Sequence, residues 1–279
     1  MSKIDYRYGE FKDVSALKKI WIDCFNDTAK GFRTFWKNIQ KITRVYVACD
    51  GSKPVACVYQ IPCTVDGQQC HYLFGAATLN DYRCKGIMKN LIDFSLEDAS
   101  DRGDKISFLF TANERFEHYY EKLGYAKLCK RKFAAVSRDE LMRVAEYGGF
   151  CVSMSVNGIY ELRNKVLLQN SLKFPIEYIK YSVAATRHYG GYTVCSGAGY
   201  AIVKEDKYGE CTISELTADE GDLYALLGEL LENTNAATFN FNYPTSYKIF
   251  ENEQILNDGM LKYLSDYKLS EAYIGLRNQ

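Results

Sequence analysis

Two cations and a glycine occupy a short polar turn between an expected strand and an expected helix. Arg83, Lys85 and Gly86 lie in this turn, and the apolar run Tyr72–Leu79 precedes it. The first N–H groups of a helix have no partner within the helix, and the helix dipole adds partial positive charge at that end. Glycine lets the backbone approach a bulky ligand, and the two cationic side chains add full charges. The stretch therefore predicts a site for a phosphate group or another anion.

A second set of chemically useful residues follows a second strand-like run, Lys105–Phe110. Asn113 is a good N-cap for a short helix that ends at Gly124. This helix carries Tyr119 and Tyr120. A phenol, with an ordinary pKa of about 10, is a suitable proton donor to a departing thiolate.

Together, the two segments resemble the motifs of the GNAT superfamily of acyl-CoA N-acyltransferases. That family has Arg/Gln-x-x-Gly-x-Gly/Ala at a helix start, and later Asn-x-x-Ala-x-x-x-Tyr-x-x-x-Gly-Phe/Tyr. The first motif is matched at Arg83 and Gly86, with Met88 where Gly or Ala is usual. The second runs from Asn113 to Tyr125, with Phe116 in place of the small residue. The two motifs occur in the order that the family has, and the resemblance covers residues 1–133.

The resemblance implies acetyl-CoA as co-substrate, with Tyr120 as the general acid that protonates the leaving thiolate. Asn113 either caps its helix only or also contacts the pantetheine arm. The positions carried over from the family as cofactor-binding residues are Ala77, Thr78, Leu79, Arg83, Cys84, Lys85, Gly86, Ile87, Met88, Lys89 and Asn113.

The sequence does not assign the general base. Many members of the family carry Glu on the strand before the turn, at the position that Phe74 occupies here. His71 on the same run, Glu215, a water molecule and the carboxyl terminus at Gln279 all stay open as candidates.

The order of elements predicts an α/β fold with a mixed sheet. Residues 4–136 read as β-α-α-β-β-β-α-β-α-β, with hairpin signals at Asp50-Gly51 and Asp66-Gly67. In the resembled family this order is the GNAT fold, and its first two helices wall the acceptor pocket.

The second half repeats this succession without detectable repetition of residues. We expect strands at Phe150–Val156, Tyr192–Ser196, Gly199–Glu205, Glu210–Leu216 and Ala237–Phe241, helices near Ile159–Gln169, Pro175–His188 and Asp222–Glu232, and a closing hairpin of Met260–Leu264 with Glu271–Leu276.

One turn distinguishes the two halves. Where the first half has its cations, the second has Asp219, Glu220 and Asp222, which would repel a pyrophosphate. We therefore expect a catalytic GNAT domain over residues 1–136, a linker over 137–149, and a degenerate GNAT-like domain over 150–279. The last would bind no cofactor and would help to form the acceptor cleft, as in tandem-GNAT acetyltransferases.

Composition excludes several classes of protein. Residues 1–150 hold 24 Lys+Arg and 19 Asp+Glu, so +5, and residues 151–279 hold 11 and 16, so −5. With zero net charge, and with basic residues that are not interleaved with aromatic residues on one stripe, nucleic-acid binding is not expected. No apolar run approaches the roughly 20 residues that span a membrane, and the polar first residues lack the apolar core that is expected of a signal peptide. The ten scattered cysteines suit a reducing cytoplasm, and the three distant histidines suggest no metal site.

The sequence thus favours an N-acetyltransferase that transfers an acetyl group from acetyl-CoA to a primary amine of a small molecule or peptide. The alternative is a non-catalytic sensor or regulatory module that binds a CoA thioester, favoured by Met88 and by the missing base and opposed by Tyr120. The acceptor, the preferred acyl chain and the formation of a homo-oligomer are left open.

Overall fold

The computed structural model describes residues 3–147 and 153–276. Contacts divide the chain into two compact units. The first unit comprises Met1–Lys127 and Gly259–Leu269, and the second comprises Leu128–Asp258 and Ser270–Gln279. The sequence predicts a first domain over 1–136. In the structure, the first unit stops at Lys127 and also includes Gly259–Leu269, a segment near the end of the chain. The late segment belongs to the first unit because Met260–Tyr263 pair with a strand of that unit, and no periodicity in the sequence predicts such a long-range pairing.

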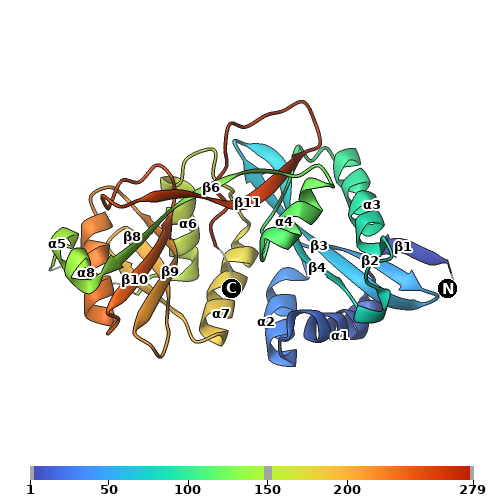
Figure 1. Cartoon of the computed structure of the whole chain (residues 1–279), viewed down its shortest axis with the longest axis horizontal. Coiled ribbons are helices and arrows are strands. Elements are labelled where there is room, and N and C mark those ends of the chain that lie inside the picture. Colours follow the sequence, from blue (N-terminus) through green and yellow to red (C-terminus); the bar gives the residue numbers. More distant parts are fainter. Residues whose placement is uncertain (1–2, 148–152, 277–279) are drawn as a thin grey trace. The chain divides into compact units, whose positions relative to one another are not determined.

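The first unit contains a mixed sheet with the strand order β1-β2-β3-β4-β5-β11 (Figure 1). β4 and β5 run parallel, and the other neighbouring strands run antiparallel. The strands are β1 (Ile4–Tyr8), β2 (Arg44–Asp50), β3 (Lys53–Val65), β4 (Gln68–Thr78), β5 (Ile106–Leu109) and β11 (Gln254–Tyr263), whose last four residues pair with β5.

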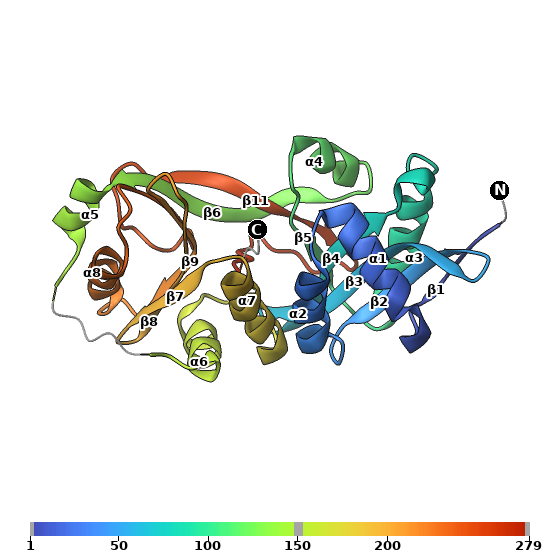
Figure 2. The same ribbon diagram turned by 90° about the horizontal axis from the view of Figure 1, so that it is seen from below.

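Helices cover both faces of this sheet. α1 and α2 lie on one face, and α3 lies on the other with α4 (Figures 1 and 2). The alternation of strand side chains explains the division. Val58 and Leu73 belong to the core that α3 and α4 share, whereas Tyr59 and Phe74 contact Phe35 of α2. The helices of the unit are η1 (Phe11–Asp13), α1 (Val14–Phe25), α2 (Ala29–Ile39), η2 (Asn80–Tyr82), α3 (Ile87–Asp101) and α4 (Glu114–Glu121).

The second unit has the same pattern of strand directions. Its order is β6-β10-β9-β8-β7, in which β9 and β10 run parallel and the other neighbours run antiparallel. Each unit thus has antiparallel hairpins followed by one parallel pair, and a helix connects the parallel strands (α3 in the first unit, α8 in the second). The strands are β6 (Ala126–Ser137), β7 (Tyr192–Ser196), β8 (Gly199–Glu205), β9 (Glu210–Ala218) and β10 (Thr238–Tyr243).

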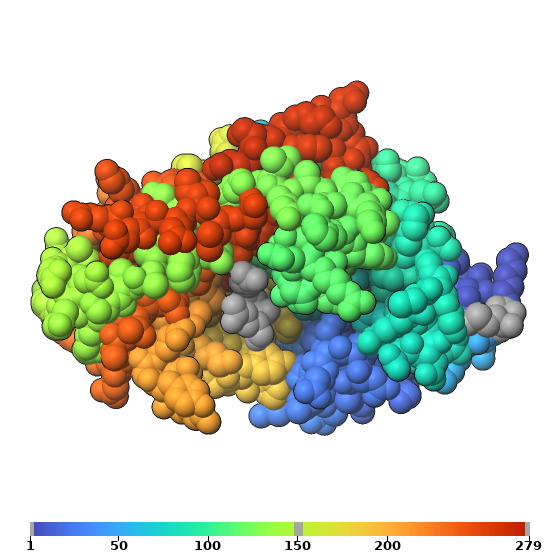
Figure 3. Space-filling view, in the orientation of Figure 1, coloured from blue at the N-terminus to red at the C-terminus, as the bar shows by residue number. Residues whose placement is uncertain are grey.

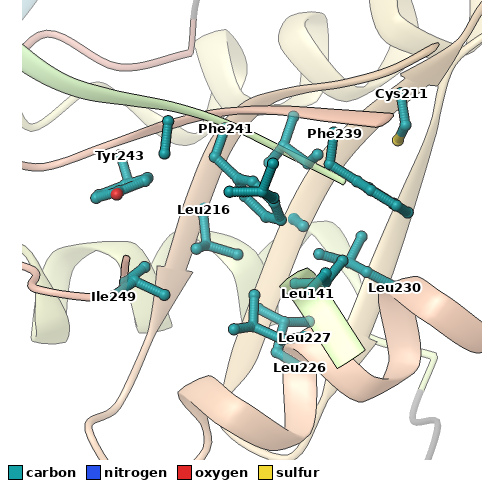
Figure 4. Packing of buried hydrophobic residues seen from close by; sticks show 14 of the residues in the cluster. Leu141, Cys211, Leu216, Leu226, Leu227, Leu230, Phe239, Phe241, Tyr243 and Ile249 are labelled. Atoms are coloured by element: carbon teal, nitrogen blue, oxygen red, sulfur yellow. The ribbon is translucent and has the colours of Figure 1, made fainter. Parts of the chain in front are cut away.

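A leucine-rich helix closes the main core of the second unit. Leu226, Leu227 and Leu230 of α8 are fully buried and point toward Phe239 and Phe241 of β10 (Figure 4). Burial of such side chains is worth roughly 1.5–3 kcal/mol each, so this contact stabilises the unit strongly. The helices of the unit are α5 (Arg138–Val144), α6 (Val156–Val166), α7 (Ile176–His188) and α8 (Leu223–Asn233).

Most predicted elements appear within one or two residues of their expected bounds, and the predicted α/β class with a mixed sheet is confirmed. Two predictions differ from the structure. The expected strand Phe150–Val156 falls partly outside the described residues, and Val156 begins α6 instead. The expected closing hairpin does not form, since Glu271–Leu276 makes only isolated bridges through Ala272 and Tyr273.

Within the described residues, no helix is long and apolar enough to cross a membrane. The nine described cysteines are free thiols, and seven of them are buried. Cys24 is half-buried and Cys84 is exposed.

An ion pair is completely buried in the second unit. Arg163 donates through Nε to Glu215 at 3.0 Å, and the two residues are 1% and 0% exposed. The other guanidinium nitrogens donate to the carbonyl oxygens of Leu172 and Ile274. Glu215 also accepts from the Tyr200 hydroxyl and from the backbone N–H of Leu276, at 2.5 Å in the latter contact. The pair therefore ties the segment near Leu276 to α6 and β9.

Glu215→Gln should destabilise the protein by about 3–5 kcal/mol, because it leaves the Arg163 charge buried without a counterion. The measurement is the free energy of unfolding from a urea titration followed by circular dichroism. Asp219→Asn is the matched control, since Asp219 pairs with Lys165 near the surface and should lose no more than about 1 kcal/mol. Equal losses in the two variants would contradict the buried-pair interpretation.

Candidate active site

The parallel strands β4 and β5 remain paired over two residue pairs only. Their register ends at Tyr72 and Phe108. β4 continues to Thr78, and over this length its other edge stays paired with β3 as far as Ala56. The backbone edge of β4 from Phe74 onward thus has no described strand beside it. An extended ligand with amide groups can pair with such an edge in the way that an added strand does.

A β-bulge lies at the start of this open edge. The register with β3 shifts between Cys57 and Tyr59, whose partners are Ala77 and Phe74. Gly75 in the bulge has φ +61°, and a Cβ there would lie 2.9 Å from the Tyr59 ring. Only glycine meets both requirements without strain. This role of Gly75 was not predicted from the sequence, although an isolated glycine inside a strand is a known signal of a bulge.

The turn after β4 presents backbone N–H groups without partners. Cys84 and Gly86 both have left-handed backbone conformations, with φ of 59° and 76°. Among the described residues, no acceptor takes a hydrogen bond from the N–H groups of Cys84 to Lys89. A Cβ on Gly86 would have no atom within 4 Å. Consecutive free N–H groups at a helix start, with open space in front of them, form an anion-binding concavity.

The cations of the turn differ in their partners. Arg83 donates through Nε to the Thr78 carbonyl at 2.9 Å, and Lys85 Nζ donates to a backbone carbonyl at 2.5 Å. Lys89 Nζ lies 2.7 Å from Asp93. Of the ion pairs between described residues, none neutralises Arg83 or Lys85. The turn therefore keeps two positive charges that an anionic ligand can meet.

Thr78 links the open strand to the turn. Its carbonyl oxygen accepts from Arg83 and also from the Cys24 thiol, with a Sγ–O distance of 3.4 Å. Its Oγ1 is buried without a partner among the described atoms. Ala77 beside it is 4% exposed, and the N–H of Leu79 is used by the Val55 carbonyl. No sequence signal pointed to Cys24, because its contact joins α1 to a strand end far along the chain.

Tyr120 lies in the apolar core that α3 and α4 share. It is 9% exposed and packs against Tyr119 and Tyr125, with ring centroids 5.2 and 5.6 Å apart. Burial raises the pKa of the Tyr120 phenol well above its ordinary value, so the hydroxyl keeps its proton at neutral pH. Among the described residues, no hydrogen-bond partner of this hydroxyl is present. Atoms of α3 and α4 lie side by side on the visible face of the first unit (Figure 3).

Asn113 is the N-cap of α4. Its side-chain oxygen accepts from the backbone N–H of Phe116 at 3.2 Å. The predicted cap is therefore present, and a contact with the pantetheine arm stays a prediction. Phe116 is 48% exposed, so the replacement of the usual small residue does not crowd the core.

His71, one candidate base, is part of a buried network. Its Nδ1 lies 2.8 Å from Asp104, which also accepts from Gln69 and Arg102. Burial lowers the pKa of His71, and its Nε2 has no partner among the described atoms. Seven residues of strand separate it from Thr78, which corresponds to about 20 Å. His71 thus lies at the opposite end of β4 from the turn.

The positions of the other candidate bases do not favour a role in accepting the amine proton. Glu215 uses its carboxylate in the buried pair with Arg163 described above. Gln279 lies outside the described residues. Phe74, at the strand position where the resembled family often has Glu, stacks on Phe35 with centroids 5.3 Å apart.

The second unit has acidic residues at the place that corresponds to the turn. Asp219 and Asp222 lie between β9 and α8, and Lys165 pairs with Asp219 at 2.6 Å. In the part of the chain that the structure describes, no group of three or more His, Cys, Asp or Glu side chains could hold a metal ion.

The sequence of the first unit matches a known family. Residues 5–128 match the family described as an acetyltransferase (GNAT) domain. This range contains the open edge of β4, the turn and α4. No curated protein sequence matches the chain.

Solved structures share the fold of this chain. A probable N-acyltransferase from Enterococcus faecalis is 15% identical, with a TM-score of 0.78 over 94% of this chain and 73% of that one. A GCN5-related N-acetyltransferase from Anabaena variabilis is 16% identical, with a TM-score of 0.75 over the same shares. A putative acetyltransferase from Pyrococcus horikoshii is 16% identical, with a TM-score of 0.61 over 100% of this chain and 97% of that one.

At these identities the similarity shows the fold, and its coverage includes both units. The family match adds the type of domain, and the open strand edge with its anion-binding turn lies inside the matched range. Residues 5–128 of the chain therefore match a GNAT acetyltransferase domain, and acyltransferase is the class of enzyme that this match supports.

Proposed function

We propose that this protein is an N-acetyltransferase that transfers an acetyl group from acetyl-CoA to a primary amine of a small molecule or peptide. The observation that carries the proposal is the row of unpartnered N–H groups from Cys84 to Lys89 at the end of an open strand edge. Such an arrangement suits a ligand that has a pyrophosphate at one end and an amide-containing arm at the other.

The cofactor would lie along β4. Its pyrophosphate would accept hydrogen bonds from the turn and meet Arg83 and Lys85. Its pantetheine arm would run along the backbone of Ala77, Thr78 and Leu79, with Ile87 and Met88 at the start of α3 and Asn113 nearby. The thioester would then reach the edge of β4 near the bulge, where backbone N–H groups can polarise its carbonyl.

The reaction forms one C–N bond and breaks one C–S bond. The neutral amine attacks the thioester carbon, the nitrogen of the tetrahedral intermediate gives its extra proton to solvent water, and the intermediate expels the CoA thiolate. We assign Tyr120 the role of protonating the thiolate sulfur, because its buried phenol stays protonated at neutral pH. Holding both reactants in place supplies a further part of the rate enhancement.

We assign no cofactor to the second unit. Carboxylates at Asp219 and Asp222 would repel the pyrophosphate that the cationic turn of the first unit attracts. A single CoA site per chain follows from this assignment.

A CoA-thioester sensor without turnover is the second candidate. The observation that favours it is the set of partners around the candidate bases, since His71 and Glu215 both lie in buried networks and Phe74 replaces the acid. Amine-dependent release of CoA thiol separates the two functions, because a sensor releases none.

Gly86→Glu should abolish acetyl-CoA binding, with a loss of affinity of at least a hundredfold. The new carboxylate would occupy the open space at the turn and repel the pyrophosphate. Isothermal titration calorimetry with acetyl-CoA measures the effect and gives the number of sites per chain.

Gly86→Gln is the matched control, because it has the same size and the same backbone strain at φ +76° without the charge. We expect it to bind more weakly than the wild type and more tightly than Gly86→Glu. Wild-type affinity in Gly86→Glu would refute the cofactor site.

Tyr120→Phe should reduce kcat by about 10²-fold or more and leave the affinity for acetyl-CoA nearly unchanged. Only the hydroxyl is lost, and it makes no described hydrogen bond that packing depends on. Steady-state kinetics of thiol release, with calorimetry for the affinity, gives both quantities.

Tyr119→Phe serves as the comparison on the same helix. Its hydroxyl is also buried without a partner among the described atoms, and burial raises its pKa to about 12. We expect this variant to keep wild-type kcat. Equal losses in both variants would mean that Tyr120 acts through packing and not as an acid.

A further inference from the structure

The second unit contains a cavity of about 220 Å³ between the C-terminal end of α7 and the sheet. α7 packs on β7 and β8, and the cavity lies where the helix stops. Its floor comes from β8 and β9, and its wall comes from the last turn of α7 and the residues that follow. All of these elements belong to the second unit, whereas the open edge of β4 and the anion-binding turn belong to the first.

A glycine holds the end of α7 close to β8. The N–H of Gly191 donates to the carbonyl oxygen of Thr186 at 2.8 Å, which closes the last turn of the helix. A Cβ on Gly191 would lie 2.5 Å from the carbonyl oxygen of Val203. Only glycine lets the chain approach the strand this closely, so the backbone itself fixes the position of the cavity wall.

The inner part of the cavity is apolar. Ala185 of α7 and Ile202 of β8 line it and are buried. Tyr189, which follows α7, also lines the cavity and is 37% exposed. An apolar cavity of about 150 Å³ can hold a benzene molecule. The present cavity therefore has room for one branched aliphatic or aromatic side chain with a small polar group attached to it.

A lysine and a hydroxyl group lie side by side on the floor. Lys204 of β8 is the antiparallel partner of Thr212 of β9, so both side chains leave the same face of the sheet, and both line the cavity. Among the described residues, Lys204 forms no ion pair and the Thr212 hydroxyl makes no hydrogen bond. The hydroxyl of Ser214, also in the lining, donates to the Ile202 carbonyl at 3.3 Å. An ammonium group beside a free hydroxyl suits a carboxylate.

A carboxylate lines the same cavity two residues farther along the chain. The Oδ1 atom of Asp206 accepts from the backbone N–H groups of Tyr208 and Glu210 at 2.8 and 3.0 Å, which fixes the side chain. Its Oδ2 atom accepts no hydrogen bond from a described residue. Lys204 and Asp206 form no ion pair with each other, although two extended residues separate their Cα atoms by only about 6.6 Å. Both charges can therefore meet a ligand that carries both signs.

The neighbouring charged residues do not line the cavity. Glu205 accepts a hydrogen bond from the Tyr192 hydroxyl, and Glu210 accepts one from the Asn240 amide. Arg187 of α7 is exposed and is not part of the lining. The described lining therefore contains one cationic and one anionic side chain, with apolar surface beside them.

We propose that this cavity binds a free α-amino acid with an apolar side chain. Its carboxylate would lie against Lys204 and Thr212, and its ammonium group would lie against Asp206. Its side chain would fill the apolar part beside Ala185 and Ile202. A ligand with only one of the two charges would leave the opposite charge of the protein desolvated without a partner, which is costly. This inference does not rest on the proposed function, since no step of the acyl transfer uses these residues.

The test is a calorimetric titration of the full-length protein with L-leucine and L-phenylalanine. Two analogues of leucine accompany them: 4-methylpentanoate lacks the ammonium group, and 3-methylbutylamine lacks the carboxylate. We expect an amino acid to bind at one site per chain, and each analogue to bind at least tenfold more weakly than leucine. Absence of binding by both amino acids, or equal binding of either analogue, would overturn the inference.

Variants locate the site. Lys204→Gln and Asp206→Asn should each weaken amino-acid binding by at least tenfold. Asparagine keeps the oxygen that accepts from the turn, so Asp206→Asn removes the charge and retains the turn. Lys207→Gln is the matched control, because Lys207 lies 5.0 Å from the Tyr208 ring in the same hairpin and does not line the cavity. Wild-type affinity in both site variants, or an equal loss in Lys207→Gln, would refute the site.

The two proposals fail in different ways. An amino acid carries a primary amine and is also a potential acceptor of the proposed N-acetyltransferase. Binding at an acceptor position would survive Lys204→Gln and Asp206→Asn, and 3-methylbutylamine would share it. Absence of acetyl-CoA binding in the wild type would refute the proposed function, whereas the amino-acid titrations would still report on the cavity of the second unit.

Discussion

The parallel pairing between β4 and β5 ends after Tyr72 and Phe108, and the other features of the candidate site are arranged around that opening. Because β3 continues to pair with the other edge of β4 beyond the opening, β4 stays part of the sheet and presents its free edge to a ligand. The bulge at Gly75 begins this row, and the turn at Cys84–Lys89 ends it. A single interruption of hydrogen bonding between two strands thus produces both the edge for an extended ligand and the approach to an anion-binding helix start.

Charge distinguishes two units that share the same order of strand directions. In the first unit the helix after the hairpins begins beside Arg83 and Lys85, and in the second the corresponding helix begins beside Asp219 and Asp222. The helix dipole favours an anion in both places. The side chains decide whether that anion comes from a ligand or from the protein itself, and this difference is why we propose a cofactor site in the first unit alone.

The buried polar groups of both units act mainly in structure. His71 with Asp104 in the first unit and Arg163 with Glu215 in the second satisfy one another inside their cores. Because these contacts engage the His71 ring and the Glu215 carboxylate, we assign neither side chain as the general base. The open end of β4 has Phe74 stacked on Phe35 at the position where the resembled family often has Glu, so the strand itself offers no carboxylate there.

The sequence by itself determined the elements of the fold and the two local motifs. Apolar periodicity, the cap at Asn113 and the glycine of the turn are local signals, and they predicted α3, α4 and the position of the anion-binding turn. It could not predict the contact of Cys24 with Thr78, the pairing of β11 with β5, or the networks that engage His71 and Glu215. Each of these joins residues far apart in the chain, and such partners are chosen by packing in three dimensions, which leaves no period in the sequence. The ring contacts of α1 and α2 have the same origin, since only the tertiary structure brought Trp21 and Phe35 together and placed Phe35 against Phe74 at the open end of β4.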